Sequence, residues 1–285
     1  MTSVSGVPGG GTTRRDVARG QRSGAAQHRA VQNRAARNRA APPDTTAETS
    51  LFVRYAQAHV ADRFGQQVAL LLAGAVTAAG DLGADELRET GADVSVEAID
   101  DDRPVTRAAI AAEPRLSRCR LGDLRTVSLA PRSYDIVQCT LLLERIRHAE
   151  LVLDRLVGAL KPGGLLLLQV RDRDSAAGFL DRALPGWTRR LIWRKHRPGR
   201  PGPHPAVYER LASVRGVQSY ALLRGLVIAE RQPLGGLAGG LRAAPRGYLS
   251  AQRAVARLSR HRLTAAHEEV LYVMRKPENR FARIL

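Results

Sequence analysis

Two predicted strands joined by a helix and a tight turn decide how this chain folds: YDIVQCT at residues 134–140 and LLLLQV at residues 165–170. Between them, Glu144 to Leu160 carries apolar residues at helical spacing. Leu165 to Val170 is apolar except for Gln169, as expected of a strand that is covered on both faces. The glycine pair after Pro162 predicts a turn with positive φ between the helix and the second strand. The stretch therefore predicts a buried β-α-β unit.

The rest of the chain repeats this alternation. Further strands are predicted at Gln67–Ala73, Asp93–Ile99, Leu116–Leu121, Leu226–Glu230 and Glu269–Met274. Helices are predicted at Leu51–Phe64, after residue 74 up to about Thr90, and at Val105–Ala112, Asp174–Leu191 (with a break at Pro185-Gly186), Tyr208–Leu223 and Ser250–Ser259. Strands that alternate with helices are typical of a parallel sheet. We expect an α/β fold, a Rossmann-like, doubly wound, mostly parallel seven-stranded sheet with helices on both faces.

Composition divides the chain into three segments. Residues 1–49 are rich in Gly, Ala, Ser, Thr and Arg with few large apolar side chains, and we expect a disordered, basic N-terminal tail. Residues 50–277 form the predicted domain, which includes a less regular cap or insertion at about 174–245. Residues 278–285 are a short C-terminal tail.

The formal net charge of +18 is typical of proteins that bind polyanions, because Lys and Arg neutralise phosphates. However, 42 of the 45 basic residues are arginine, and Ala, Gly, Leu and Pro are also abundant. GC-rich coding explains this bias as readily as selection for nucleic acid does. We therefore expect no nucleic-acid partner and keep a nucleic-acid-associated protein as a third alternative only.

Cysteine usage and hydropathy bear on the compartment. Cys119 and Cys139 lack the spacing of a disulfide framework or a zinc site, and the sequence indicates no metal site. The longest apolar run, Val68 to Gly80, is too short to cross a bilayer. We expect a cytoplasmic protein without a transmembrane segment.

Four motifs along the central stretch occur in an order and spacing that a known family shares. They are Gly122-Asp123, Ser133-Tyr134-Asp135-Ile136-Val137, Leu143-Glu144-Arg145-Ile146 and Leu160-Lys161-Pro162-Gly163-Gly164. They resemble the G-D, S-F-D-V-V, L-E-H-I and L-K-P-G-G motifs of class I S-adenosylmethionine-dependent methyltransferases. The resemblance covers roughly Leu51 to Pro277. Within this family, the chain resembles the small-molecule methyltransferases that are related to those of ubiquinone biosynthesis.

The resemblance implies S-adenosylmethionine as the cofactor and suggests the residues that contact it. The adenine would lie by Asp123, although a solvated turn acid or a helix N-cap is an ordinary alternative at that position. The ribose acid would be Asp100, or as second choice Glu97, because a shift of one residue in strand register decides which side chain faces the ligand. The alternative is a solvated acidic turn. Gln138 and Thr140 would line the cleft or be satisfied core polar groups. In all, the implied cofactor-binding residues are Ala73, Gly74, Glu97, Asp100, Asp123, Leu124, Gln138 and Thr140.

The sequence departs from the family at the glycine motif, D-x-G-x-G-x-G, which follows the first strand. Only Gly74 matches, since Leu72 replaces the acid and Val76 and Ala78 replace the later glycines. A β-branched side chain is unfavourable at positive φ, and the missing acid removes a charged partner for the cofactor's amine. We expect weakened cofactor binding.

The function implied is methyl transfer to a small-molecule acceptor by in-line attack on the sulfonium methyl. His148 and His204 are candidate bases, each with the alternative of an ordinary surface histidine. In the cap, Trp187, Trp193 and Tyr208 interleave with Arg189, Arg190, Arg194 and Lys195. This pattern suits an aromatic, lipid-like or anionic acceptor, or else an amphipathic helix packed on the sheet. The main alternative is a non-catalytic member of this fold that acts as a scaffold or binds a partner.

Overall fold

The computed structural model describes residues 43–63, 66–74, 87, 91–111, 116–196, 204–235 and 246–278. The chain divides into two units, Met1–Pro43 and Asp44–Leu285, and nearly all described residues belong to the second unit. None of the described helices is both long and apolar enough to cross a bilayer.

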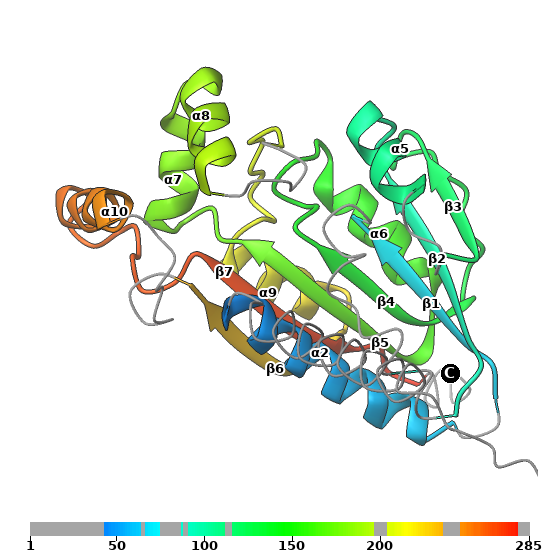
Figure 1. The fold of residues 1–285 in the computed structure, drawn as a ribbon. Helices are drawn as coiled ribbons and strands as arrows, with labels where there is room; N and C mark the ends of the chain where they lie inside the picture. The colour runs from blue at the N-terminus through cyan, green and yellow to red at the C-terminus, as the bar shows by residue number, and fades with distance from the viewer. Residues whose placement is uncertain are drawn as a thin grey trace, which may run out of the picture. The chain divides into compact units, whose positions relative to one another are not determined.

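The core of this unit is a seven-stranded sheet in the order β3-β2-β1-β4-β5-β7-β6 (Figure 1). The strands are β1 (Val68–Ala73), β2 (Val94–Asp100), β3 (Arg118–Leu121), β4 (Tyr134–Thr140), β5 (Leu160–Arg171), β6 (Val227–Leu234) and β7 (Glu269–Arg275). The pairs among β1 to β5 are parallel, whereas β7 is antiparallel to both of its neighbours. The predicted mostly parallel, seven-stranded sheet is confirmed.

Helices cover both faces of the sheet, as predicted. The described helices are α2 (Pro43–Ala61), α5 (Pro104–Ala111), α6 (Ala149–Ala159), α7 (Ala176–Ala183), α8 (Gly186–His196), α9 (Val214–Leu223) and α10 (Arg246–Leu258). On one face Phe52 of α2 packs in a core with Leu70 of β1. On the other face Leu153 of α6 and Val217 of α9 share a core with Leu71. Alternate residues of β1 thus face opposite layers.

The glycine pair before the central strand lies inside β5. Gly163 has φ 75, so the predicted positive φ is confirmed. The pairing of β4 with β5 shifts here, from Tyr134 opposite Leu160 to Ile136 opposite Leu165, so the residues form an irregularity within the strand instead of a turn before it. Gly163 N donates to Lys276 O at 2.8 Å, which holds this irregular segment against the end of the chain's last strand.

Two helices begin later than the sequence predicts. α6 was expected from Glu144 but begins at Ala149, because Leu141 and His148 have φ of 46 and 58 and the intervening residues form turns. α9 was expected from Tyr208 but begins at Val214, because Tyr208 has φ 48. Left-handed residues cannot continue an α-helix, so each marks chain that turns before the helix starts.

Several other elements extend beyond their predicted limits: α8 runs to His196 instead of Leu191, and α10 begins at Arg246 instead of Ser250. β6 runs on past Glu230 to Leu234, because a proline, here Pro233, is tolerated on the edge strand of a sheet. α2 begins at Pro43, so the boundary drawn between residues 49 and 50 falls within a helix. The helix predicted to end near Thr90 lies outside the described residues, apart from Leu87.

Candidate active site

A cavity of about 500 Å³ lies where the parallel strands β2, β3 and β4 end. Its lining residues come from the chain that follows each of these strands, from α6 and from the segment before α9. They are Asp101, Arg103, Gly122, Asp123, Leu124, Arg125, Arg145, Ile146, Arg147, Val152, Pro205 and Val207. Ligands of open α/β sheets bind at this carboxyl edge, so the cavity is the candidate site.

Asp123 and Leu124 both line the cavity, where the sequence places the adenine contacts. Arg125 donates from Nη2 to Asp123 Oδ2 at 2.6 Å and from its backbone N to Oδ1 at 2.9 Å. These hydrogen bonds lower the pKa of Asp123 to about 2, so the carboxylate stays ionised at neutral pH. These contacts also fit the alternative of a turn acid, and the adenine contact stays a prediction.

Asp100 ends β2, and it is engaged in a buried ion pair. Its side chain and that of Arg145 are both 0% exposed, and Arg145 Nη2 contacts Asp100 Oδ1. The same carboxylate oxygen accepts from Asp101 N at 2.8 Å. Arg145 lines the cavity and Asp100 does not. The candidate ribose acid is therefore held in a buried ion pair and is not exposed to the cavity.

Glu97, the alternative ribose acid, lies farther back along β2. It accepts from Tyr134 Oη at 3.0 Å and from Arg120 Nη2 at 3.3 Å, and it does not line the cavity. Burial and the bond to Glu97 raise the pKa of Tyr134 to about 12, so the hydroxyl remains a donor. Of the two acids, Asp100 is the one at the strand's end.

The end of β1 retains one feature of the glycine motif. Gly74 has φ 82, and its N donates to Ile99 O at 3.1 Å, so this position needs a glycine. Ala73 is buried between β2 and β4, and Leu72 packs in the apolar core on the α2 face. The departures at Val76 and Ala78 lie outside the described residues.

Gln138 and Thr140 on β4 are buried and do not line the cavity. Gln138 Nε2 donates to Thr140 Oγ1 at 3.0 Å, which satisfies the nitrogen end of the Gln138 amide. Gln138 Oε1 has no hydrogen-bond partner among the residues that the structure describes. The described contacts thus do not bring this pair to the cavity.

The two candidate bases lie in different settings. His148 is exposed at the N-cap of α6, its ring makes no cap bond, and its backbone N donates to Glu209 Oε1 at 2.7 Å. His204 is partly buried, with Nδ1 3.3 Å from Arg145 Nη1, and it precedes Pro205 of the cavity lining. Burial, reinforced by Arg145, lowers the pKa of His204 to about 4. His204 is therefore neutral at pH 7. Each histidine adjoins a lining residue in the chain, Arg147 for His148 and Pro205 for His204, and neither histidine itself lines the cavity.

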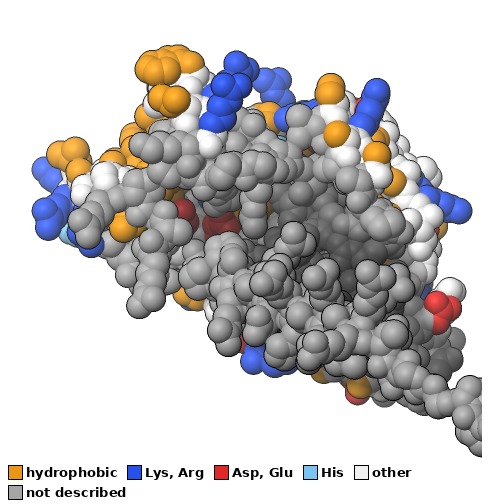
Figure 2. All heavy atoms as spheres, viewed as in Figure 1, with side chains coloured by type: hydrophobic (Ala, Val, Ile, Leu, Met, Phe, Trp, Pro, Cys, Tyr) orange, Lys and Arg blue, Asp and Glu red, His pale blue; other side chains and the backbone are white. Residues whose placement is uncertain are grey.

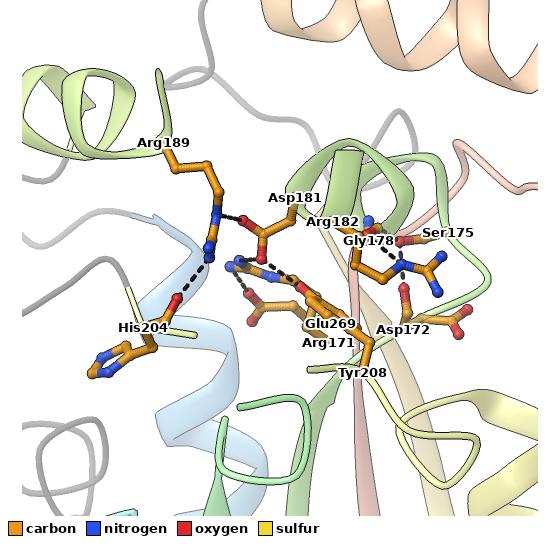
Figure 3. A network of polar contacts seen from close by, with 10 residues as sticks. All are labelled: Arg171, Asp172, Ser175, Gly178, Asp181, Arg182, Arg189, His204, Tyr208 and Glu269. Atoms are coloured by element: carbon orange, nitrogen blue, oxygen red, sulfur yellow. Dashed lines mark hydrogen bonds and ion pairs between the residues drawn. The ribbon is translucent and has the colours of Figure 1, made fainter. Parts of the chain in front are cut away.

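A polar network beyond β5 anchors the cap (Figure 3). Arg171, at the end of β5, donates to Glu269 Oε1 at 2.7 Å. Asp181 of α7 accepts from Tyr208 Oη at 2.8 Å and from Arg189 Nε of α8 at 2.7 Å. Through Arg189 and the buried Tyr208, Asp181 joins both cap helices to the segment that leads to α9.

Sequence reasoning did not assign Arg145, Arg171, Asp181 and Glu269 to the site. A signal existed for Arg145, because it stands where the resembled motif has a histidine. The others had no comparable signal, since Arg171 and Glu269 are 98 residues apart in the chain.

One face of α8 points to solvent instead of toward the site. Trp187 and Leu191 are 71% and 64% exposed, and Arg190 and Arg194 are exposed on the same face. In Figure 2, hydrophobic and cationic side chains lie next to each other over this helix. Tyr208, the other cap aromatic expected at the acceptor, is buried in the network. Neither aromatic offers a face to the cavity.

The chain has recognisable similarity to known proteins. Residues 73–168 match a family model described as a methyltransferase domain. No curated protein sequence matches the chain significantly.

Solved structures with a similar fold include several methyltransferases. An S-adenosylmethionine-dependent methyltransferase from Mesorhizobium loti is 15% identical with a TM-score of 0.46, over 73% of this chain and 91% of that one. The 1,6-didemethyltoxoflavin-N1-methyltransferase from Burkholderia thailandensis, solved with its substrate and S-adenosylhomocysteine, is 14% identical with a TM-score of 0.43, over 95% and 94% of the two chains. YcgJ from Bacillus subtilis is 14% identical with a TM-score of 0.47, over 82% and 99%.

Proposed function

We propose that this chain, which carries a class I S-adenosylmethionine-dependent methyltransferase domain, transfers a methyl group to a small-molecule acceptor. The observation that carries the proposal is the cavity at the carboxyl ends of β2, β3 and β4, in a domain that the family model matches. Its volume of about 500 Å³ lies within the ordinary range of small-molecule sites.

The residues around the cavity fit the cofactor in part. Asp123 and Leu124 line the cavity and are the proposed adenine contacts, and Gly74 keeps the backbone at the end of β1 open. Asp100, the proposed ribose acid, is held by Arg145. When bound, the cofactor supplies a methyl group that its sulfonium makes electrophilic. The protein's contribution is to position the acceptor and exclude water, which is worth up to about 7 to 11 kcal/mol.

The acceptor we favour is anionic. Four arginines line the cavity; Arg103, Arg125 and Arg145 are paired with Asp101, Asp123 and Asp100, so these groups together leave an excess of one positive charge, that of Arg147. The arginines are Arg103, Arg125, Arg145 and Arg147. Where the acceptor presents a hydroxyl, neutral His204 is the proposed base, and its low pKa makes it a weak one. His148 is not placed for this role by its described contacts.

Calorimetric titration of the full chain with S-adenosylmethionine and S-adenosylhomocysteine tests the proposal. Binding at micromolar concentration supports it, and no heat at millimolar concentration contradicts it. Incubation of the protein with S-adenosylmethionine and a panel of aromatic carboxylates, matched with their neutral amides, then tests the acceptor class by mass spectrometry. Methylation of the amides alone would contradict an anionic acceptor.

A non-catalytic protein of the same fold is the second candidate. The buried pair of Asp100 and Arg145, together with Leu72 at the position of the family's acid, favours it. Both features remove groups that would otherwise hold the cofactor. The same titration separates the two candidates, because a non-catalytic scaffold of this kind should bind neither cofactor form.

A further inference from the structure

Arg145 and Asp100 form an ion pair from which solvent is fully excluded. Both side chains are 0% exposed, although the residues lie 45 positions apart in the chain. Asp100 ends β2, and Arg145 stands in the turns between β4 and α6. Breaking a buried pair by removing one partner is costly because the other charge stays buried. The pair is therefore a strong local interaction in the protein as described.

The position of Arg145 affects whether a ligand in the cavity can reach the Asp100 carboxylate. Arg145 is among the residues that line the cavity, whereas Asp100 is not. Arg145 Nη1 approaches His204 Nδ1 at 3.3 Å, and its Nε has no hydrogen-bond partner among the described residues. Because the paired side chains of Arg145 and Asp100 are both 0% exposed, a ligand in the cavity can reach the carboxylate only if Arg145 moves.

Two hydroxyl donors of a ribose and the guanidinium of Arg145 would require the same carboxylate oxygens. We infer that Arg145 competes with the cofactor's ribose for Asp100 and thereby sets the affinity of this chain for adenosine cofactors. The inference rests on the proposed function. Binding requires Arg145 to leave Asp100, so part of the ribose's interaction energy offsets the loss of the ion pair.

Substitution of Arg145 tests this competition. Arg145→Gln and Arg145→His, the latter restoring the residue of the resembled motif, should each bind S-adenosylhomocysteine about ten- to a hundredfold more tightly than the unchanged chain, the range expected for a hydrogen bond to a charged group. Arg145→Lys, which keeps a cation beside Asp100, should gain much less. Adding Asp100→Asn to Arg145→Gln should abolish the gain.

Two features of the design exclude simpler explanations. S-adenosylhomocysteine lacks the sulfonium charge, so repulsion between cofactor and arginine contributes little. Arg107→Gln is the matched control, because it removes a cation from the exposed Arg107–Asp102 pair just beyond β2, and neither residue of this pair lines the cavity. Circular dichroism and thermal unfolding with and without ligand report whether each variant folds, and the ligand-induced rise in Tm gives affinity independently of calorimetry.

The outcomes are distinct. Tighter binding by the Gln and His variants, but not by Arg107→Gln, supports the inference. If folded Arg145→Gln or Arg145→His binds S-adenosylhomocysteine equally or less tightly than the unchanged chain, the inference is overturned. The proposed function then stands, provided that the unchanged chain binds. If only one of the two variants folds, that variant decides. The absence of binding by every folded chain at millimolar ligand overturns both the proposed function and the inference.

Discussion

Arg189 of α8 donates from Nε to Asp181 Oδ1 of α7 at 2.7 Å, and both side chains are largely buried. The same guanidinium donates from Nη2 to the carbonyl oxygen of His204 at 2.6 Å. These bonds fasten the cap to residues 204–207, which supply part of the cavity wall. The cap is thus connected to the cavity wall through the backbone of His204, although no described residue of α8 lines the cavity.

Arg189→Gln should loosen this connection. Loss of the charge-assisted bonds is expected to lower the free energy of unfolding by about 1.5 to 3 kcal/mol. Arg190→Gln changes the next residue of the same helix, which is exposed, and should stay within about 0.5 kcal/mol. Urea unfolding measures both. Hydrogen exchange at residues 204–208 should accelerate only in the Arg189 variant, and equal exchange in the two variants would contradict the coupling.

Asp123→Asn tests the adenine contact. The carboxylate, held ionised by Arg125, lines the cavity, and an adenine amino group would donate to it. The amide is a weaker acceptor, so the dissociation constant for S-adenosylhomocysteine should rise about tenfold. Asp102→Asn is the control, because Asp102 is also a partly exposed acid paired with an arginine but does not line the cavity. A similar loss in both variants would indicate a general charge effect instead.

Glu144→Gln should stabilise the protein at high pH but not at low pH. Burial raises the pKa of Glu144 from 4.5 to about 7. Between these values the folded state holds a proton that the unfolded state has lost, so stability falls as pH rises through this range. Glutamine does not titrate, so the variant does not lose stability in this way. The difference in the free energy of unfolding between the variant and the unchanged chain should therefore grow by up to about 3 kcal/mol between pH 4.5 and pH 8.

The comparison must be made as a difference between variant and unchanged chain. Burial lowers the pKa of His59 to about 4, which gives the unchanged chain an opposing slope over part of the same range. Glu150→Gln, which neutralises an exposed carboxylate on α6, should change stability about equally at both pH values. An advantage of Glu144→Gln that does not depend on pH would rule out a buried, titrating carboxyl.

Local sequence was enough to predict most of the fold. β4 was predicted with its observed limits, Tyr134–Thr140, and all of its residues are buried. The start of α6 was not predictable from local preference, since Glu144 to His148 has the composition of a helix and turns only because Leu141 and His148 adopt positive φ. Helical periodicity does not report the conformation of single residues.

The site was predictable as far as strand order alone determines it. Parallel strands place Asp100 and Asp123 at one edge of the sheet, as expected. Which partner each acid takes depends on contacts between distant parts of the chain, such as Arg145 with Asp100, and spacing carries no information about these. The degenerate glycine motif predicted weak cofactor binding for one reason, and the ion pair supplies a second, independent one.

Gly178→Ala should disturb the start of α7. The Gly178 N donates to Oγ of the N-cap residue Ser175 at 2.9 Å, and a Cβ on Gly178 would collide with the carbonyl oxygen of Asp172 and approach Arg173 Cα at 3.2 Å. Because both neighbours are backbone atoms, they cannot rotate away, and we expect a loss of about 1 to 3 kcal/mol in the free energy of unfolding.

Gly158→Ala is the matched control within α6, where a Cβ would meet nothing within 4 Å. There alanine should stabilise by about 0.5 to 1 kcal/mol. Urea unfolding of both variants decides, and a Gly178→Ala protein as stable as Gly158→Ala would mean that α7 does not start against the Asp172 backbone as described.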